Sequence, residues 1–133
     1  MVEMIFFDAN FLVSFYIEDE KDHERALEIM KSSKNKNKII SKLIIGETVN
    51  ILFTKLKVDK NTIKKVYESL NNDYTIINDS YIFDKTIDKI MNSEKRFPFF
   101  DYVYIILMED LGIKEIATFD KHFNNILGIE RIY

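Results

Sequence analysis

Cysteine is absent from this sequence of 133 residues, and proline and glycine are rare, with one and three copies. Without cysteine the protein has no disulfide, no thiolate zinc site and no cysteine nucleophile, which points to a reducing compartment. With so little proline and glycine there is no linker-like segment, and we find no internal repeat or low-complexity tract. Because 47% of the residues are hydrophobic, we expect one domain over residues 1–133 around a single core.

Long apolar runs are missing as well. No run approaches the roughly 20 residues that a membrane-spanning helix needs, and the first residues lack the basic and apolar regions of a signal peptide. We therefore expect a soluble, cytoplasmic protein with no membrane contact. The net charge of −3 argues against a nucleic-acid partner, but residues 31–42 carry five lysines and no acid. This stretch is either a solvated turn or a patch that steers phosphates.

Short apolar strands alternate with helices along the chain. The hydrophobic pattern predicts strands over residues 4–7, 38–41, 74–78, 114–119 and 129–132. Helices are predicted over residues 11–17, 18–33, 42–57, 59–70, 79–93 and 99–111, with a helical turn over 121–125. Such alternation implies right-handed crossovers and a parallel sheet covered on both faces. The predicted fold class is therefore α/β, a three-layer α/β/α sandwich with a central, mainly parallel sheet of about five strands.

Two acids directly follow predicted strands. Asp8 comes after the strand over 4–7, and Asp120 comes after the strand over 114–119. In a parallel sheet ligands bind outside the carboxyl ends of the strands, so both side chains should line one edge. A helix N-cap, for which Asp is well suited, is the alternative explanation for either acid alone.

Glu47 lies on a predicted helix whose core stripe consists of Ile45, Val49, Leu52 and Leu56. It lies off this stripe, yet Leu43 and Ile51, four residues before and after it, are apolar. A carboxylate on a second apolar face should point into a cleft or meet a cation. The alternative is an exposed glutamate beside chance hydrophobic neighbours.

Asp101 falls in the first turn of the predicted helix over 99–111, inside an aromatic run that extends from Phe97 to Tyr104. The helix dipole favours a carboxylate at this position by roughly 0.3 to 1 kcal/mol, so capping alone could explain it. If Asp8, Glu47, Asp101 and Asp120 converge, however, each close pair would repel by roughly 4 kcal/mol. A divalent cation removes this repulsion, and oxygen ligands select Mg²⁺ or Mn²⁺ over zinc. The chemistry that suits such a site is phosphodiester hydrolysis.

The order and setting of the acids resemble the PIN-domain nucleases, in particular the VapC-type toxins of toxin–antitoxin pairs. The segments that carry the resemblance are FFDANFLV, ISKLIIGETVNIL, FFDYVYIILMEDLGI and IATFDKHFNNILGIERI. The resemblance implies a catalytic site of Asp8, Glu47, Asp101 and Asp120 that cleaves structured RNA. Asp8, Asp101 and Asp120 are the expected ligands of Mg²⁺ or Mn²⁺, and Glu47 is either a further ligand or the residue that orients the attacking water.

Partners follow from the same resemblance. It implies an RNA substrate of the tRNA or rRNA class, a homodimer, and a cognate antitoxin whose basic C-terminal tail offers Arg to the carboxylates. Asn10 and Thr118 would support the site by hydrogen bonding. One departure is that bulky Tyr102, Val103 and Tyr104 follow the third acid, where family members usually carry small residues. Such groups would reshape the helix packing or the dimer face.

Two alternatives to a nuclease stay open at this point. A non-catalytic PIN-like scaffold could bind RNA or protein without cutting, although four retained acids argue against it. A receiver-type phosphoacceptor domain would need paired acids after the first strand and a lysine near the last, but Ala9 and Asn10 follow Asp8 and residues 129–132 contain no lysine. Of the two histidines, His23 is expected to be solvated, and His122, although nearer the site, is not assigned a role.

Overall fold

A five-stranded sheet organises the part of the chain that the computed structural model describes, residues 2–133. The strands are β1 (Met4–Phe7), β2 (Asn37–Ser41), β3 (Thr75–Ile77), β4 (Glu115–Ala117) and β5 (Glu130–Ile132). Their spatial order is β3-β2-β1-β4-β5, and every neighbouring pair is parallel. The predicted α/β class with a parallel sheet of about five strands is confirmed.

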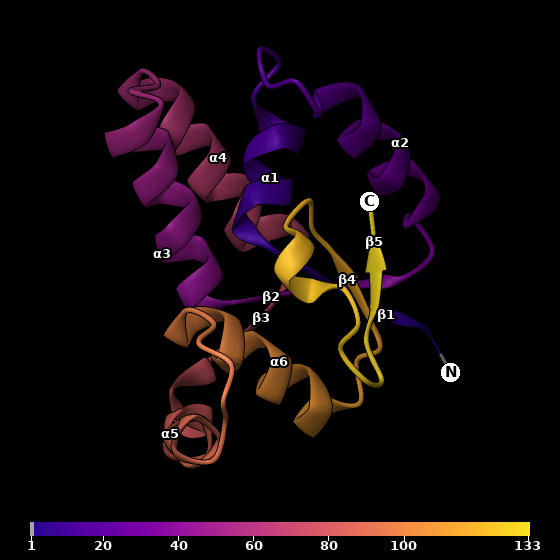
Figure 1. Ribbon diagram of the computed structural model, residues 1–133. Coiled ribbons are helices and arrows are strands. Elements are labelled where there is room, and N and C mark those ends of the chain that lie inside the picture. Colours follow the sequence, from indigo (N-terminus) through magenta and orange to yellow (C-terminus); the bar gives the residue numbers. More distant parts are fainter. Residues whose placement is uncertain (1) are drawn as a thin grey trace.

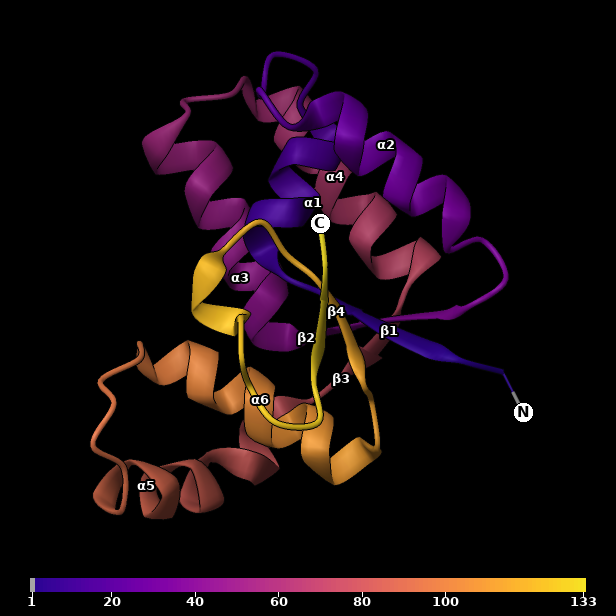
Figure 2. The same ribbon diagram turned by 45° about the vertical axis from the view of Figure 1, so that its right-hand side comes forward.

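Helices cover both faces of the sheet (Figure 1). They are α1 (Ala9–Tyr16), α2 (His23–Ser32), α3 (Lys42–Asn50), α4 (Lys60–Asp73), α5 (Phe83–Met91) and α6 (Phe99–Leu111). In Figures 1 and 2, α1, α2 and α4 lie on one side of the sheet while α5 and α6 lie on the other. This is what right-handed crossovers require, because the chain moves outward from β1 to β3 and then returns across the sheet to β4. The predicted three-layer arrangement is therefore present.

The central strand β1 determines where a site can form. Its residues Ile5, Phe6 and Phe7 are fully buried, with β2 on one side and β4 on the other. Because the chain leaves β1 toward β2 in one direction and β4 is inserted on the opposite side, the carboxyl ends of β1 and β4 form a topological switch point. The Asp8 N–H donates to the Ala117 carbonyl over 3.1 Å. Asp8 therefore lies beside the end of β4.

Helix α6 spans the residues that the sequence predicts for it. Every residue from Tyr102 to Met108 is buried, as expected for a helix that is apolar around its whole circumference. Pro98 forms the N-cap, and Gly112 ends the helix in the left-handed conformation with φ of 71°. The Ile113 N–H then donates to the Met108 carbonyl over 2.9 Å and closes the last turn. These two end signals explain why the predicted bounds of this helix are correct.

The predicted helix over 42–57 is not uniform. It runs as α3 to Asn50 and continues as a π-helical turn, Ile51–Lys55, in which the Leu56 N–H donates to the Ile51 carbonyl over 2.9 Å. The most deeply buried residues are Ile44, Thr48 and Leu52, whereas the predicted stripe members Ile45, Val49 and Leu56 are half-buried. The predicted stripe is thus displaced by one residue along most of its length, because this helix packs between neighbours on two sides.

Two further predicted helices are shorter than expected. The segment over 18–33 becomes helical only at His23, and the residues before it form turns. The segment over 79–93 begins with a 3₁₀ turn, Asp79–Ile82, and becomes α5 at Phe83. The buried Asp79 carboxylate accepts the Leu43 N–H over 3.2 Å, which ties this turn to the start of α3.

The lysine-rich stretch lies mostly at the amino edge of the sheet, opposite Asp8. Lys36 forms ion pairs with Glu115 over 2.6 Å and with Glu3 over 3.9 Å. The ammonium of Lys38 lies 5.5 Å from the centre of the Tyr74 ring. These contacts favour a structural role for this stretch over phosphate steering at the acids. Across residues 2–133, no helix combines the length and apolarity that crossing a bilayer demands.

Replacing Gly112 tests the end of α6. In Gly112→Ala a side chain must adopt a left-handed conformation, which should lower the free energy of unfolding by about 1 kcal/mol. Gly46→Ala is the matched control, because Gly46 is exposed within α3 and its substitution should raise that free energy by about 0.5 to 1 kcal/mol. Urea unfolding of both variants measures the difference. If both substitutions changed the free energy of unfolding equally and in the same direction, the assigned end of α6 would be wrong.

Candidate active site

Asp8 occupies the centre of the site, at the switch point between β1 and β4. Its Oδ1 accepts the Ala9 N–H over 2.9 Å, so it caps α1, and its Oδ2 accepts the Thr118 hydroxyl over 2.8 Å. The residue is only 5% exposed, and within residues 2–133 no lysine or arginine pairs with it. The pKa of Asp8 is raised to about 7, mainly by burial; the Thr118 hydrogen bond lowers it, and the charges of Asp101 and Glu47 contribute to the rise. Asp8 is thus an N-cap and also a buried carboxylate without a counter-charge.

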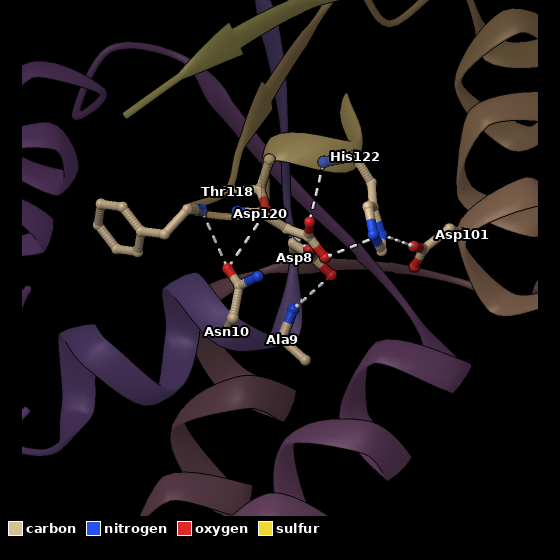
Figure 3. Close-up of polar contacts among 8 residues, drawn as sticks. Asp8, Ala9, Asn10, Asp101, Thr118, Asp120 and His122 are labelled. Carbon is tan, nitrogen blue, oxygen red and sulfur yellow. Dashed lines mark hydrogen bonds and ion pairs between the residues drawn. The ribbon is translucent and has the colours of Figure 1, made fainter. Parts of the chain in front are cut away.

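The loop after β4 is fixed to the start of α1 by a small hydrogen-bond network (Figure 3). The Asn10 side-chain oxygen accepts the Phe119 N–H over 3.1 Å and lies 3.2 Å from the Thr118 hydroxyl. The Thr118 hydroxyl oxygen in turn accepts the Asp120 N–H over 3.1 Å. Thr118 is fully buried. These bonds hold Asp8 and Asp120 in a fixed relation, which is the supporting role expected of Asn10 and Thr118.

Asp101 and Asp120 meet at His122. The His122 Nδ1 atom lies 3.3 Å from Asp101 Oδ2 and 3.4 Å from Asp120 Oδ2. Figure 3 shows the His122 ring between these two carboxylates. The backbone N–H of His122 also donates to Asp120 Oδ1 over 2.9 Å, at the start of the 3₁₀ turn Lys121–Phe123. Burial raises the pKa of Asp101, as does the charge of Asp120, while His122 lowers it. One potential ligand atom from each of these three residues lies within 4.8 Å of the others.

Glu47 reaches the site from α3 and is held by α6. The Tyr104 hydroxyl donates to Glu47 Oε1. Burial raises the pKa of Glu47, the Tyr104 hydrogen bond lowers it, and the charge of Asp101 raises it. Glu47 is therefore a half-buried acid beside other acids, rather than an exposed residue next to chance hydrophobic neighbours.

Among the described residues, the group whose potential ligand atoms lie within 4.8 Å of one another consists of Asp101, Asp120 and His122 and does not include Asp8 or Glu47. The four sequence-predicted acids are nevertheless near enough to affect one another's charge. Asp8 interacts with Asp101 and Glu47, Glu47 interacts with Asp101, and Asp101 interacts with Asp120. His122 is the member that sequence analysis did not assign. Its position two residues after Asp120 is the only signal available, because the contact depends on the short turn that follows β4.

The donor set fits a hard divalent cation. Carboxylate oxygens from separate elements converge, and in the described part of the chain the only basic group that contacts Asp101 or Asp120 is the His122 ring. Oxygen-rich sites of this kind suit Mg²⁺ or Mn²⁺, and an imidazole nitrogen is tolerated better by Mn²⁺. Burial is the main cause of the raised pKa values of Asp8, Glu47 and Asp101, and repulsion between the acids adds to it. A bound cation would offset both effects, because it favours the charged form of each carboxyl group.

A cavity of about 330 Å³ adjoins the cluster on the side of Asn10, Phe119 and Asp120. Lys21 and Lys55 also line it. Asp120 is the one predicted site acid among its lining residues, so this depression reaches the edge of the cluster and carries both charged and apolar groups.

Comparison with known proteins identifies relatives. The sequence profile of the PIN domain matches residues 5–128, and no curated protein sequence matches the chain closely enough to count as a relative. The solved structure of Mycobacterium tuberculosis VapC20, described as a sarcin-ricin loop cleaving toxin, is similar with a TM-score of 0.79 and 16% identity, over 95% of this chain and 98% of that one.

Two similar structures come from toxin–antitoxin complexes. One is a complex from Klebsiella pneumoniae, with a TM-score of 0.68 and 16% identity over 95% of both chains. The other is VapBC2 of Rickettsia felis bound to a promoter DNA fragment, with a TM-score of 0.68 and 13% identity over 97% of both chains. At these identities the likeness shows that the fold is shared.

Removing the Asp8 charge should change how stability depends on pH. A folded-state pKa of about 7, against an ordinary 3.8, means that the folded protein holds this proton more tightly than the unfolded chain. The contribution of Asp8 to the free energy of unfolding is therefore at its maximum below about pH 4. This contribution is lost as the pH rises through about 7, by up to about 4 kcal/mol in metal-free protein. The free energy of unfolding of Asp8→Asn, measured by urea unfolding with EDTA, should fall much less between about pH 5 and about pH 8. Parallel pH profiles for the two proteins would contradict the unpaired state of Asp8.

Proposed function

The chain belongs to the PIN domain family, and on this premise we propose that it is a metal-dependent endoribonuclease that hydrolyses structured RNA, as the toxin of a type II toxin–antitoxin pair. The observation that carries the proposal is the convergence of Asp8, Glu47 and Asp101 beside Asp120 without a lysine or arginine among them. Because an uncompensated acidic cluster at a switch point is costly to fold, it favours a function that uses a cation there. We extend the proposal to one PIN domain over residues 1–133.

The four acids divide into two roles in the proposed reaction. Asp8, Asp101 and Asp120 would hold Mg²⁺ or Mn²⁺, with His122 beside the last two. Such an ion, when bound, polarises the phosphate and lowers the pKa of the attacking water. Glu47 has one oxygen occupied by the Tyr104 hydroxyl, so its other oxygen is available to orient that water or to accept its proton. The raised pKa of Glu47 brings it closer to the operating pH of a general base.

The proposed partners follow from the charge of the site and from the relatives. An RNA of the tRNA or rRNA class is the proposed substrate. A cognate antitoxin with a basic C-terminal tail is the proposed inhibitor, because Arg can pair bidentately with the site carboxylates and displace metal or substrate. The Klebsiella and Rickettsia structures are toxin–antitoxin complexes, which supports an antitoxin partner. A homodimer in the cytoplasm completes the proposal.

Cleavage of purified tRNA and rRNA in the presence of Mn²⁺ tests this function. We expect Asp101→Asn to lower the cleavage rate by about 100-fold or more, because a ligand and its charge are lost. Glu109→Gln is the matched control, since Glu109 is an exposed acid on the same helix and should leave the rate unchanged. EDTA should abolish cleavage by the wild type.

The result that would contradict the proposal is equally specific. Wild-type protein that binds these RNAs but leaves them intact with either Mg²⁺ or Mn²⁺ would identify a non-catalytic scaffold. Cleavage that survives both EDTA and Asp101→Asn would show that the acids are not the catalytic site.

A further inference from the structure

An aromatic stack extends from the acidic cluster onto the connection between α5 and α6. The Phe97 ring stacks on the His122 ring, with centroids 5.8 Å apart and planes 18° from parallel. The other contacts of His122 are to Asp101 and Asp120, so this stack begins at the proposed metal ligands. The His122 side chain is 51% exposed. An open aromatic surface therefore lies directly beside the reacting centre.

Two cations accompany this stack. The Lys95 ammonium lies 5.6 Å from the centre of the Phe97 ring, and Arg96 is exposed next to it. Neither residue forms an ion pair with any carboxylate among residues 2–133. The cluster itself is acidic, so Lys95 and Arg96 supply positive charge that can attract a polyanion on this side of the site.

The connection is fixed in place although it has no regular secondary structure. The Tyr102 hydroxyl donates to the Lys95 carbonyl over 2.6 Å and lies 2.7 Å from the Ser93 hydroxyl. The Tyr102 ring also packs against Phe97, with centroids 5.3 Å apart. Because Tyr102 is buried in the first turn of α6, it ties the connection to the same helix that carries Asp101. Figure 2 shows this connection leaving the end of α5 and rising to the start of α6.

We propose that Lys95, Arg96, Phe97 and His122 form a substrate-positioning rim that holds a single-stranded segment of the structured RNA beside the scissile phosphate. A base of the flanking nucleotide extends the stack of Phe97 and His122, while Lys95 and Arg96 contact its backbone phosphates. Aromatic stacking combined with cations along the backbone is the usual way in which single strands are bound without sequence readout. The inference rests on the proposed function and adds to it the contacts that place the substrate.

Binding is measured with the full chain carrying Asp8→Asn, which should retain RNA without cutting it. The probe is a fluorescently labelled pool of single-stranded RNA of random sequence, titrated by anisotropy over a series of salt concentrations. Lys95→Gln and Arg96→Gln should each reduce the slope of log affinity against log salt by about 0.7. Lys34→Gln is the matched control, because Lys34 is an exposed lysine at the opposite edge of the sheet and its loss changes the net charge equally.

Phe97 is tested separately from the charges. Phe97→Leu keeps an apolar side chain but removes the stack, and it should weaken binding about tenfold or more while leaving the salt slope unchanged. Phe97→Tyr should bind RNA as tightly as the protein that retains Phe97. Circular dichroism melting of each variant verifies that it is folded.

The outcomes separate this inference from the proposed function. If the wild type cuts RNA but Phe97→Leu and Lys95→Gln bind no differently from Lys34→Gln, the rim is wrong and the nuclease assignment stands. If the wild type never cuts but binding depends on Phe97 and Lys95, the rim stands and the assignment fails. If the protein binds no RNA at all, the proposed rim is wrong.

Discussion

Burial of one carboxylate between two neighbouring strands is the constraint on which the site depends. Asp8 is fixed at the carboxyl end of β1 by backbone pairing with β4 and by the Thr118 hydroxyl. A buried carboxylate without a counter-charge destabilises the fold, so Asp8 must either hold a proton, as its raised pKa allows, or face a cation when it is charged. Burial is also the main cause of the raised pKa values of Asp101 and Glu47.

The tyrosines that depart from the family pattern have clear structural roles. Tyr104 is fully buried and donates to Glu47, and the carboxylate raises the pKa of this tyrosine together with burial, its main cause. Tyr102 fixes the connection between α5 and α6. Both side chains leave the same turn of α6 as Asp101 and reach in different directions. Tyr102 and Tyr104 therefore shape the surroundings of Asp101 in two directions. The sequence predicted only that these bulky residues would alter the packing.

Much of the fold follows from local signals, whereas the geometry of the site does not. The bounds of α6 were predictable because Pro98 and Gly112 mark its ends, and the positions of Asp8 and Asp120 followed from the strands before them. The π-helical turn after Asn50 was missed, since no residue in Ile51–Lys55 marks a change from the α-helical hydrogen-bond pattern. His122 was missed because its contact with Asp101 joins two elements far apart in sequence. The catalytic and metal-binding roles of the acids stay predictions.

Locating a bound ion tests the central claim most directly. Crystals grown or soaked with Mn²⁺ can be measured at the manganese absorption edge, where anomalous scattering identifies the metal without assumptions about the site. The account predicts an anomalous peak in contact with carboxylate oxygens of Asp8, Asp101 and Asp120. A peak coordinated only by other residues, or no peak at this cluster at saturating Mn²⁺, would contradict it.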